Sequence, residues 1–342
     1  MNNAIRCGCR TAVMPIIVFL FLSLCYASAF GSTTIRKIVF GLSWFAQAQD
    51  GGYYQAIAKG YYKNVGLDVK IVQGGPDVHG QQLLVAGQYQ FLMGKALNTI
   101  VAASRGLPVI TVATIFQKSP AAILAHWHIL KPVDLASHGN RILVSPSEQN
   151  TWWPWAMRRF GYSSRQEGIY TGSIIPFLVD RNIAEQTYMG TDGYYLLKQK
   201  RRFRTFLLAD YGYPEYSETI ETTRQMLEKH PIIVKKFVRA SLEGWVSYLR
   251  NPEPGDKLIE LANKHQSGGL LRYGYISLKH NGLILDGKVL KQGLGIMSNK
   301  RWLKIDQVAV RNHLVKSSFD YKRCYTLSVI NSIHVTPMET NK

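Results

Sequence analysis

The sequence predicts an α/β fold in which helices cover a parallel sheet. Short segments rich in β-branched and aromatic residues alternate with helical segments over residues 37–116. The same alternation returns over residues 141–208, and from residue 224 onward the pattern is helical. With 342 residues, of which 46% are hydrophobic, the chain is long enough for two domains with cores of their own.

The first α/β segment has strand and helix patterns in regular alternation. After the first strand, Tyr53, Ile57 and Tyr61 recur at helical spacing. The expected strands are residues 37–42, 67–72, 89–93 and 109–116, and the further expected helices are 81–86 and 97–104.

The second segment repeats this plan with a longer polar loop. Strand 141–144 is followed by the loop 145–151 and by a helix over 152–160. The remaining expected strands are 168–170, 185–189 and 203–208, with helices at 176–181 and 194–200. Apolar residues at helical spacing then predict one long amphipathic helix over 234–249, which Pro252 and Pro254 end.

The N-terminus has the features of a secretory signal peptide. Arg6 and Arg10 precede an apolar run over residues 13–24, and the small residues 27–29 are typical of a cleavage site. We therefore expect residues 1–29 to be removed and the protein to be exported to the periplasm. A lipoprotein signal ending at Cys25 is the alternative, although Leu24 is bulky for it. Only Cys324 would remain afterwards, which excludes an intrachain disulfide.

The charge balance is strongly basic. Lysine and arginine number 41 against 22 acidic residues, a formal net charge of +19. The basic runs, such as residues 198–202, are short and lack interleaved aromatic residues, which argues against nucleic-acid binding. Attraction to an anionic membrane face or an anionic ligand is the expected consequence.

Residues 42–62 have the pattern of a strand end, a polar and glycine-bearing turn, and then a helix. In α/β domains such a loop lies at the carboxyl end of the strand, where ligands bind. Trp44 offers a flat face, Gln47 and Gln49 offer amide groups, and Gly51 and Gly52 leave the helix N-terminus open.

This stretch carries the most specific family resemblance of the chain. The motif W-F-x-Q-A-Q-x-G-G-Y-Y at residues 44–54, followed by A-K-G-Y-Y and G-L-D-V, resembles the opening of the NMT1/THI5-like periplasmic binding proteins. That family includes ABC-importer receptors for thiamine-type pyrimidines, and receptors for sulfonate, nitrate and riboflavin are its relatives. Further similar segments are residues 115–120, 207–214, 237–245 and 295–302.

The resemblance implies a two-lobed periplasmic binding protein fold of type II, with two crossovers and a ligand in the cleft. Lobe 1 would comprise residues 30–119 and 213–342, and lobe 2 residues 120–212. Ligand-binding residues would come from both lobes; the candidates are Trp44, Gln47, Gln49, Asp50, Gly94, Lys95, Gln117, Ser147, Asn150, Thr151, Trp153 and Asp192. Relatives often have an acidic residue followed by proline where this chain has Asp192-Gly193.

Enzyme and metal signatures are weak. Gly87 to Lys95 is not a phosphate loop, because Ala96 stands where Ser or Thr is required. His126 and His128 share a strand face without an identifiable third metal ligand. We expect no metal and no cofactor.

The sequence and the resemblance therefore predict a monomeric, non-enzymatic receptor for a small heteroaromatic ligand, with a thiamine-precursor pyrimidine as the first choice. Its partner would be the permease of an ABC importer, which a cytoplasmic ATPase drives. The alternatives are a sulfonate, nitrate or riboflavin receptor, a pyrimidine synthase-like enzyme that holds pyridoxal phosphate through Lys95, and a non-transporting sensor.

Overall fold

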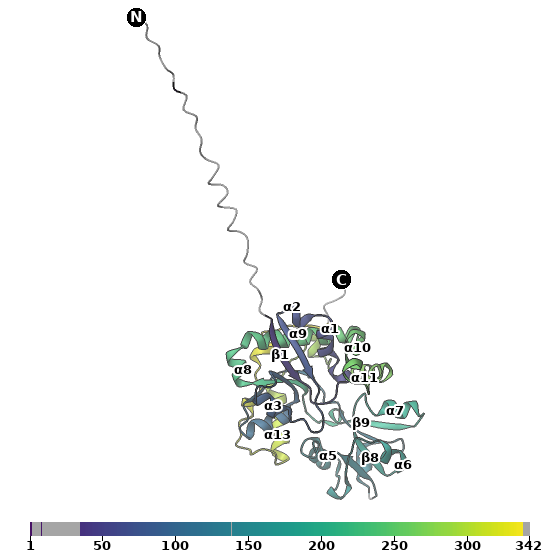
Figure 1. Ribbon diagram of the computed structural model, residues 1–342. Helices are drawn as coiled ribbons and strands as arrows, with labels where there is room; N and C mark the ends of the chain where they lie inside the picture. Colours follow the sequence, from purple (N-terminus) through teal and green to yellow (C-terminus); the bar gives the residue numbers. More distant parts are fainter. Residues whose placement is uncertain (2–7, 9–34, 138, 338–342) are drawn as a thin grey trace. The chain divides into compact units, whose positions relative to one another are not determined.

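The computed structural model describes residues 1, 8, 35–137 and 139–337 (Figure 1). The expected signal peptide, residues 1–29, lies outside the described residues except for Met1 and Gly8. The described residues from Ile35 to Pro337 belong to one compact unit.

Within the described residues, the named strands form two five-stranded sheets. The first has the order β2-β1-β3-β10-β4 and the second the order β7-β6-β8-β5-β9. The strands of the first sheet are β1 (Arg36–Gly41), β2 (Leu67–Val72), β3 (Phe91–Lys95), β4 (Val109–Phe116) and β10 (Ser217–Thr223). Those of the second are β5 (Ala121–His126), β6 (Arg141–Val144), β7 (Glu167–Ile169), β8 (Ile183–Tyr188) and β9 (Phe203–Leu207).

Both sheets are mixed, which corrects the expectation of a parallel sheet. Strand β10 pairs antiparallel with β3 and β4, and β5 pairs antiparallel with β8 and β9. The reason is the chain path. The chain passes from the first sheet to the second through residues 117–120 and returns through residues 208–216, and each crossing delivers a strand that enters its new sheet in the opposite direction.

Helices cover both faces of the first sheet. Along β1, Ile38 and Phe40 face a core that includes α9, whereas Val39 faces the opposite cluster. Helices of the N-terminal half are α1 (Gly51–Ala58), α2 (Tyr61–Asn64), α3 (Gly80–Val85) and α4 (Ala96–Ser104), with the short 3-10 helix η1 (Ala48–Asp50) before α1. The C-terminal helices are α8 (Arg224–Lys229), α9 (Pro231–Arg250), α10 (Glu253–Ala262), α11 (Gly268–His280), α12 (Val289–Gln292), α13 (Asn299–Arg311), η5 (Tyr321–Cys324) and α14 (Ser328–Asn331).

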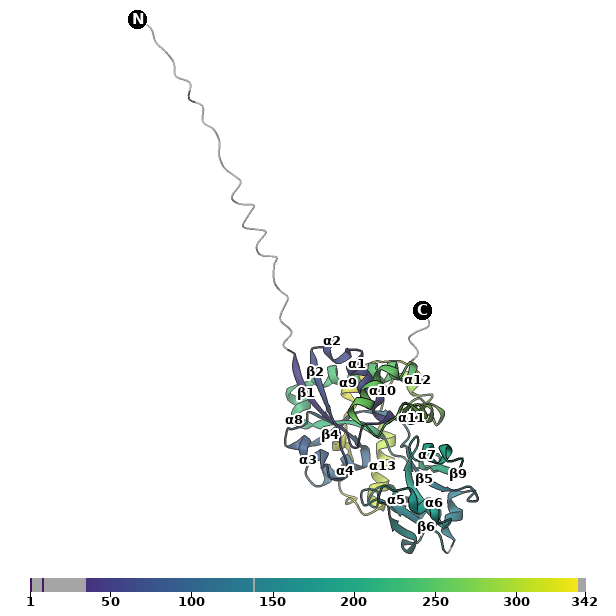
Figure 2. The same cartoon turned by 45° about the vertical axis from the view of Figure 1, so that its right-hand side comes forward.

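The second sheet has its own helices, which Figures 1 and 2 show grouped around it in teal. They are α5 (Trp152–Phe160), α6 (Ile175–Val179) and α7 (Gly193–Lys198), with the 3-10 turns η2 (Pro132–Ala136), η3 (Ser164–Gln166) and η4 (Leu208–Tyr211). Trp152 and Trp153 of α5 pack in one core with Ile123 and Ile142 of the sheet. Leu124 on the opposite face packs with Phe177 and Leu196 of α6 and α7.

The long helix α9 confirms the periodicity of the sequence and contacts α1 at very short range. A Cβ atom on Gly244 would lie 2.2 Å from the carbonyl oxygen of Gly52 and 2.6 Å from the Cβ of Ala56. Because backbone atoms cannot move aside easily, glycine is required there for the helices to pack.

We therefore predict that Gly244→Ala destabilises the protein by about 1–3 kcal/mol, the usual cost of overpacking. Urea unfolding of the two proteins measures this difference. Gly287→Ala is the matched control, because a Cβ there meets open space. An equal effect of the two substitutions would contradict the packing argument.

Candidate functional site

The loop after β1 presents two aromatic side chains to solvent. Trp44 and Phe45 are each 46% exposed, and their rings meet edge to face at 5.6 Å. Gln73 supports this loop, because its side-chain oxygen accepts a hydrogen bond from the Ala46 amide at 2.8 Å. Its amide group donates to the Ala262 carbonyl of α10 at 2.8 Å. The indole of Trp44 is therefore held on a supported loop and remains accessible.

The predicted polar residues of this loop hold the backbone. The Gln47 amide donates to Asp50 Oδ2 at 2.9 Å, so that Asp50 closes the turn before α1. Gln49 is buried, and its side chain donates to the Met189 carbonyl at 2.9 Å, directly after β8 of the second sheet. Gln49 thus links the first sheet's loop to the second sheet.

Lys95, the last residue of β3, forms an ion pair with a residue of the second sheet's loop. Its Nζ lies 2.5 Å from Glu148 Oε1 and donates to the Tyr188 hydroxyl at 2.5 Å. Tyr188 donates to Glu148 Oε1 at 2.7 Å, and the Thr151 hydroxyl donates to Glu148 Oε2. Tyr188 is the last residue of β8, and Glu148 follows β6. The carboxyl ends of strands from both sheets therefore meet at this pair, where α/β proteins bind ligands.

Both partners of this pair are charged. Burial lowers the pKa of Lys95, but Glu148, Tyr188 and Glu215 more than offset this and hold that pKa well above its ordinary value. Burial raises the pKa of Glu148, whereas Lys95 and the hydrogen bonds from Thr151 and Tyr188 bring it below its ordinary value. Lys95 is thus an ammonium group with its counter-ion already in place.

Gly94 and Gln117 have structural partners in the first sheet's unit. A Cβ atom on Gly94 would lie 2.0 Å from Glu221 Oε1, so this glycine makes room for a buried carboxyl group. Gln117 is buried and donates to the Ile296 carbonyl at 3.0 Å.

The candidates from the second sheet differ in accessibility. Ser147 and Asn150 are exposed, and the Ser147 hydroxyl lies 2.9 Å from that of Ser145. Trp153 is buried, and its indole nitrogen donates to Glu167 Oε2 at 2.7 Å. Asp192 accepts a hydrogen bond from Thr187 at 2.6 Å, and burial raises its pKa. Trp153 therefore lies in a core. In the loop before it, Ser147 and Asn150 are accessible, whereas Thr151 is buried.

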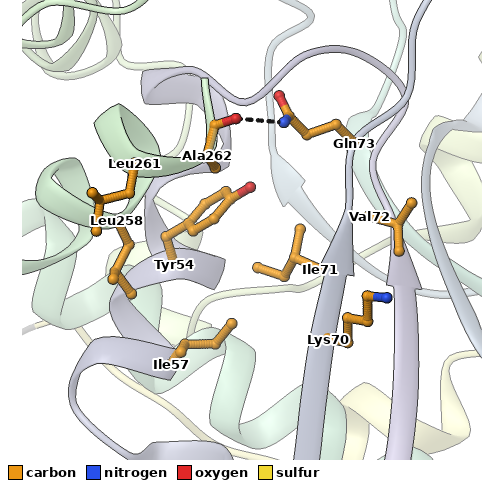
Figure 3. Close-up of a pocket in the computed structure, with 9 residues that line it drawn as sticks. All are labelled: Tyr54, Ile57, Lys70, Ile71, Val72, Gln73, Leu258, Leu261 and Ala262. Atoms are coloured by element: carbon orange, nitrogen blue, oxygen red, sulfur yellow. Dashed lines mark hydrogen bonds between the residues drawn. The ribbon is translucent and has the colours of Figure 1, made fainter. Parts of the chain in front are cut away.

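A mainly apolar hollow of about 550 Å³ lies beside the edge strand β2 (Figure 3). Tyr54 and Ile57 of α1 and Leu258 and Leu261 of α10 face residues 70–73 across it. None of the twelve candidate residues lines this hollow. Its polar side chains are those of Tyr54, Lys70 and Gln73, and the Gln73 amide already donates to the Ala262 carbonyl.

Two further features were examined among the described residues, a metal-binding cluster and a membrane-spanning helix. His126 stacks on Phe177 at 4.2 Å, and no group of three or more His, Cys, Asp or Glu side chains is placed to hold a metal among the described residues. In the same part of the chain, no helix has both the length and the apolar character needed to cross a bilayer.

Comparison with known protein families identifies the family of this chain. Residues 47–254 match the family described as NMT1/THI5 like, which is more than half of the sequence. The chain belongs to the NMT1/THI5-like family. The family that the motif at residues 44–54 indicated is thereby confirmed.

Two characterised relatives of this NMT1/THI5-like protein are binding proteins. The riboflavin-binding protein RibY of Chloroflexus aurantiacus is 23% identical over 305 residues, covering 86% of this chain and 86% of the relative. The formylaminopyrimidine-binding protein of Halalkalibacterium halodurans is 25% identical over 247 residues, covering 70% of this chain and 74% of the relative.

Solved structures confirm the fold of this family member. The periplasmic aliphatic sulphonate binding protein SsuA from Escherichia coli aligns with a TM-score of 0.63 and 14% identity, over 84% of this chain and 91% of that one. A Candida albicans protein with the generic periplasmic binding protein structural fold aligns with a TM-score of 0.58 and 14% identity, over 90% and 98%. The expected periplasmic binding protein fold is therefore present.

Several polar residues of the candidate site were not among the predicted residues. Glu148 lies inside the predicted polar loop 145–151, so its position was foreseeable although its partner was not. Tyr188 lies in a predicted strand. Glu215 lies two residues before β10 and Glu218 lies inside it. This segment was not expected as a strand, because acidic residues interrupt its β-branched pattern.

Proposed function

We propose that this chain is the solute receptor of an ABC importer and binds a flat heteroaromatic ligand, with a thiamine-precursor pyrimidine as the first choice. The observation that carries the proposal is the convergence of strand ends from both sheets at Lys95, Glu148 and Tyr188. The two relatives support the ligand class, because each is named for the heteroaromatic compound that it binds, riboflavin or formylaminopyrimidine.

The two sheets would be the cores of two lobes, residues 30–119 with 213–342 and residues 120–212. Hinge motion at the two crossings would open and close the cleft between them, as in other binding proteins of this kind. Trp44 would stack on the ligand ring, and the loop at residues 147–151, in which Ser147 and Asn150 are exposed, would contact a polar tail. The protein would act in the periplasm as a monomer and dock on a membrane permease.

A pyridoxal-phosphate enzyme fits the site less well. A lysine that forms a Schiff base must react as the neutral amine. Glu148 and Tyr188 instead stabilise the ammonium form of Lys95. We therefore propose a receptor and not an enzyme.

Substitution of Trp44 tests the receptor proposal. We expect Trp44→Ala to weaken binding of the heteroaromatic ligand about two- to tenfold, because one aromatic stack contributes about 0.5–1.5 kcal/mol. Titration calorimetry with formylaminopyrimidine, riboflavin, taurine and nitrate identifies the ligand first.

The matched control is Trp127→Ala, because Trp127 is a tryptophan of similar exposure, 50%, on the second sheet's surface. Equal affinity of wild type and Trp44→Ala for the true ligand would remove Trp44 from the site. Absence of binding to every compound would remove the ligand class.

A further inference from the structure

The second sheet has a far end that lies opposite to the candidate site. In the pairing of β5 with β8, Ala121 lies opposite Tyr188, whose hydroxyl accepts a hydrogen bond from Lys95. Strand β5 therefore runs away from the site, and its last residue, His126, pairs with Phe203, the first residue of β9. Strand β9 is an edge strand of this sheet (Figure 2). The side chains at this far end are thus not part of the candidate site.

An exposed apolar loop, residues 127–133, follows β5 at this end. The large side chains of Trp127, Leu130 and Val133 are 50%, 62% and 51% exposed. The backbone of the loop is held in place, because two of its amides donate to Asp134 Oδ2, at 3.0 and 2.8 Å. Single exposed apolar side chains are normal on a protein surface. Three of them in one short, supported loop indicate instead a surface that contacts an apolar phase or a partner.

Basic side chains lie directly beside this apolar loop. The guanidinium group of Arg202 lies over the Trp127 ring, 4.5 Å from the ring centroid. Arg204 of β9 donates from its Nε to the Trp127 carbonyl at 3.1 Å. These two contacts fix the loop against the edge strand. Three further basic side chains, all exposed, lie at the end of α7 and in the turn before β9; they are Lys198, Lys200 and Arg201. The apolar loop and these five basic residues together form a distal patch.

The positive charge of the distal patch is not neutralised by ion pairs within the protein. Among the residues that the structure describes, none of the five basic side chains has a carboxylate within ion-pair distance. Two carboxyl groups lie at this end of the sheet. Asp134 accepts backbone hydrogen bonds of its own loop, and Asp180, whose carbonyl oxygen lies 3.1 Å from His126, accepts from the amide of Asn182. The patch is therefore suited to a partner that carries negative charge.

The combination of basic and apolar side chains favours a lipid membrane over a nucleic acid as this partner. Anionic headgroups attract basic side chains, and tryptophan and aliphatic side chains enter the boundary between the headgroups and the acyl chains. A nucleic acid offers phosphate groups to the basic residues but no apolar phase to Leu130 and Val133. It would also need free aromatic faces for base stacking, and Arg202 already covers one face of Trp127.

We infer that the distal patch binds the surface of a membrane that contains anionic phospholipids. The apolar loop enters the headgroup region, and the five basic residues contact lipid phosphate groups around it. This inference goes beyond the proposed receptor function, because it concerns a different face of the molecule and holds whichever small molecule the receptor binds. The patch and the candidate site lie at opposite ends of β5, so a substitution in the patch leaves ligand binding in solution unchanged.

Co-sedimentation of the mature chain with lipid vesicles tests this inference. We expect binding to phosphatidylglycerol vesicles that weakens as the salt concentration rises, and no comparable binding to phosphatidylcholine vesicles. The double substitution of Lys200→Gln with Arg201→Gln should weaken binding to phosphatidylglycerol at least tenfold, because each basic residue near an anionic surface contributes about fivefold in affinity. The matched control is Lys235→Gln with Lys236→Gln, which removes the same charge from exposed positions on α9. It should bind nearly as wild type does.

Fluorescence quenching by brominated phosphatidylglycerol tests the apolar loop directly. The bromine atoms should quench the tryptophan fluorescence of the bound wild type, and Trp127→Phe should lose most of this quenching. Equal quenching of the two proteins would show that the loop does not enter the membrane and would overturn the inference.

The vesicle experiment has two further outcomes that overturn the inference. One is equal binding to the two lipids, or equal binding of the two double variants, since either shows that the charge of the patch does not direct binding. The other is binding to a single-stranded oligonucleotide without binding to phosphatidylglycerol, which would assign the patch to a nucleic acid. Equal melting temperatures of the two double variants exclude misfolding as the cause of a difference between them.

Discussion

Replacing Glu148 with alanine should lower the free energy of unfolding by about 3–5 kcal/mol, because removal of one partner leaves a buried charge uncompensated. Lys95 would lose its counter-ion, and the hydroxyl groups of Tyr188 and Thr151 would lose their shared acceptor. The pair also joins the two sheets, so the loss should affect the transition of the whole unit.

Urea unfolding followed by tryptophan fluorescence measures this loss of stability. Two further variants test whether the loss comes from the buried ion pair. The double substitution Lys95→Met with Glu148→Leu should recover most of the loss, since hydrophobic residues of similar volume often replace a buried ion pair without cost. Glu253→Ala is the matched control, because the pair of Glu253 with Lys257 lies on the surface. If Glu148→Ala costs no more than Glu253→Ala, the ion pair does not stabilise the fold.

The linear pattern of the sequence predicted the elements that surround this pair. Residues 67–72 and 109–116 are strands with the expected bounds, and the helix over 152–160 follows the expected polar loop. These segments were predictable because each has a strong local pattern and a turn signal at its end. Lys95 was singled out through the family resemblance, which implies a ligand-facing loop at this strand end. Its partner Glu148 lies 53 residues away in the sequence and can be identified only in the fold.

Strand β10 shows which kind of element the local sequence pattern does not predict. In β10, Glu218 and Glu221 stand within a buried strand, and acidic residues are depleted in strands. The buried carboxyl group of Glu221 receives hydrogen bonds from distant segments of the chain. Thr99 donates to its Oε1 at 2.7 Å and Gln81 to its Oε2 at 3.3 Å. A pattern that depends on such partners cannot be read from neighbouring residues. The candidate site shares this property, because its carboxyl groups come from four separate segments.

The buried carboxyl groups also predict an unusual dependence of stability on pH. Burial raises the pKa of Asp50 and of Glu185 to about 8 and that of Glu221 to about 7, whereas their ordinary values are 3.8, 4.5 and 4.5. A raised pKa means that the folded state binds protons that the unfolded state has released. The contribution of this proton binding to the free energy of unfolding is therefore fully present below about pH 4. It is lost as the pH rises through the pKa values of the folded state.

We accordingly expect the melting temperature to fall as the pH rises from 5 to 8, because each such group contributes up to about 1.4 kcal/mol per pH unit. Glu148 acts oppositely, since its pKa is lowered, but its contribution changes only below its ordinary value of 4.5. Calorimetric melting of wild type and Glu185→Leu from pH 5 to pH 8 tests whether the buried carboxyl groups cause this fall in melting temperature.

Both Glu185 oxygens are buried without partners among the described residues, and Glu185 pairs in the sheet with Leu124 and Leu143. Leucine should thus raise stability at pH 8 and flatten the curve, whereas the exposed control Glu228→Gln should leave it unchanged. A melting temperature that rises with pH over this range would show that these carboxyl groups ionise in the folded protein and are stabilised there by partners.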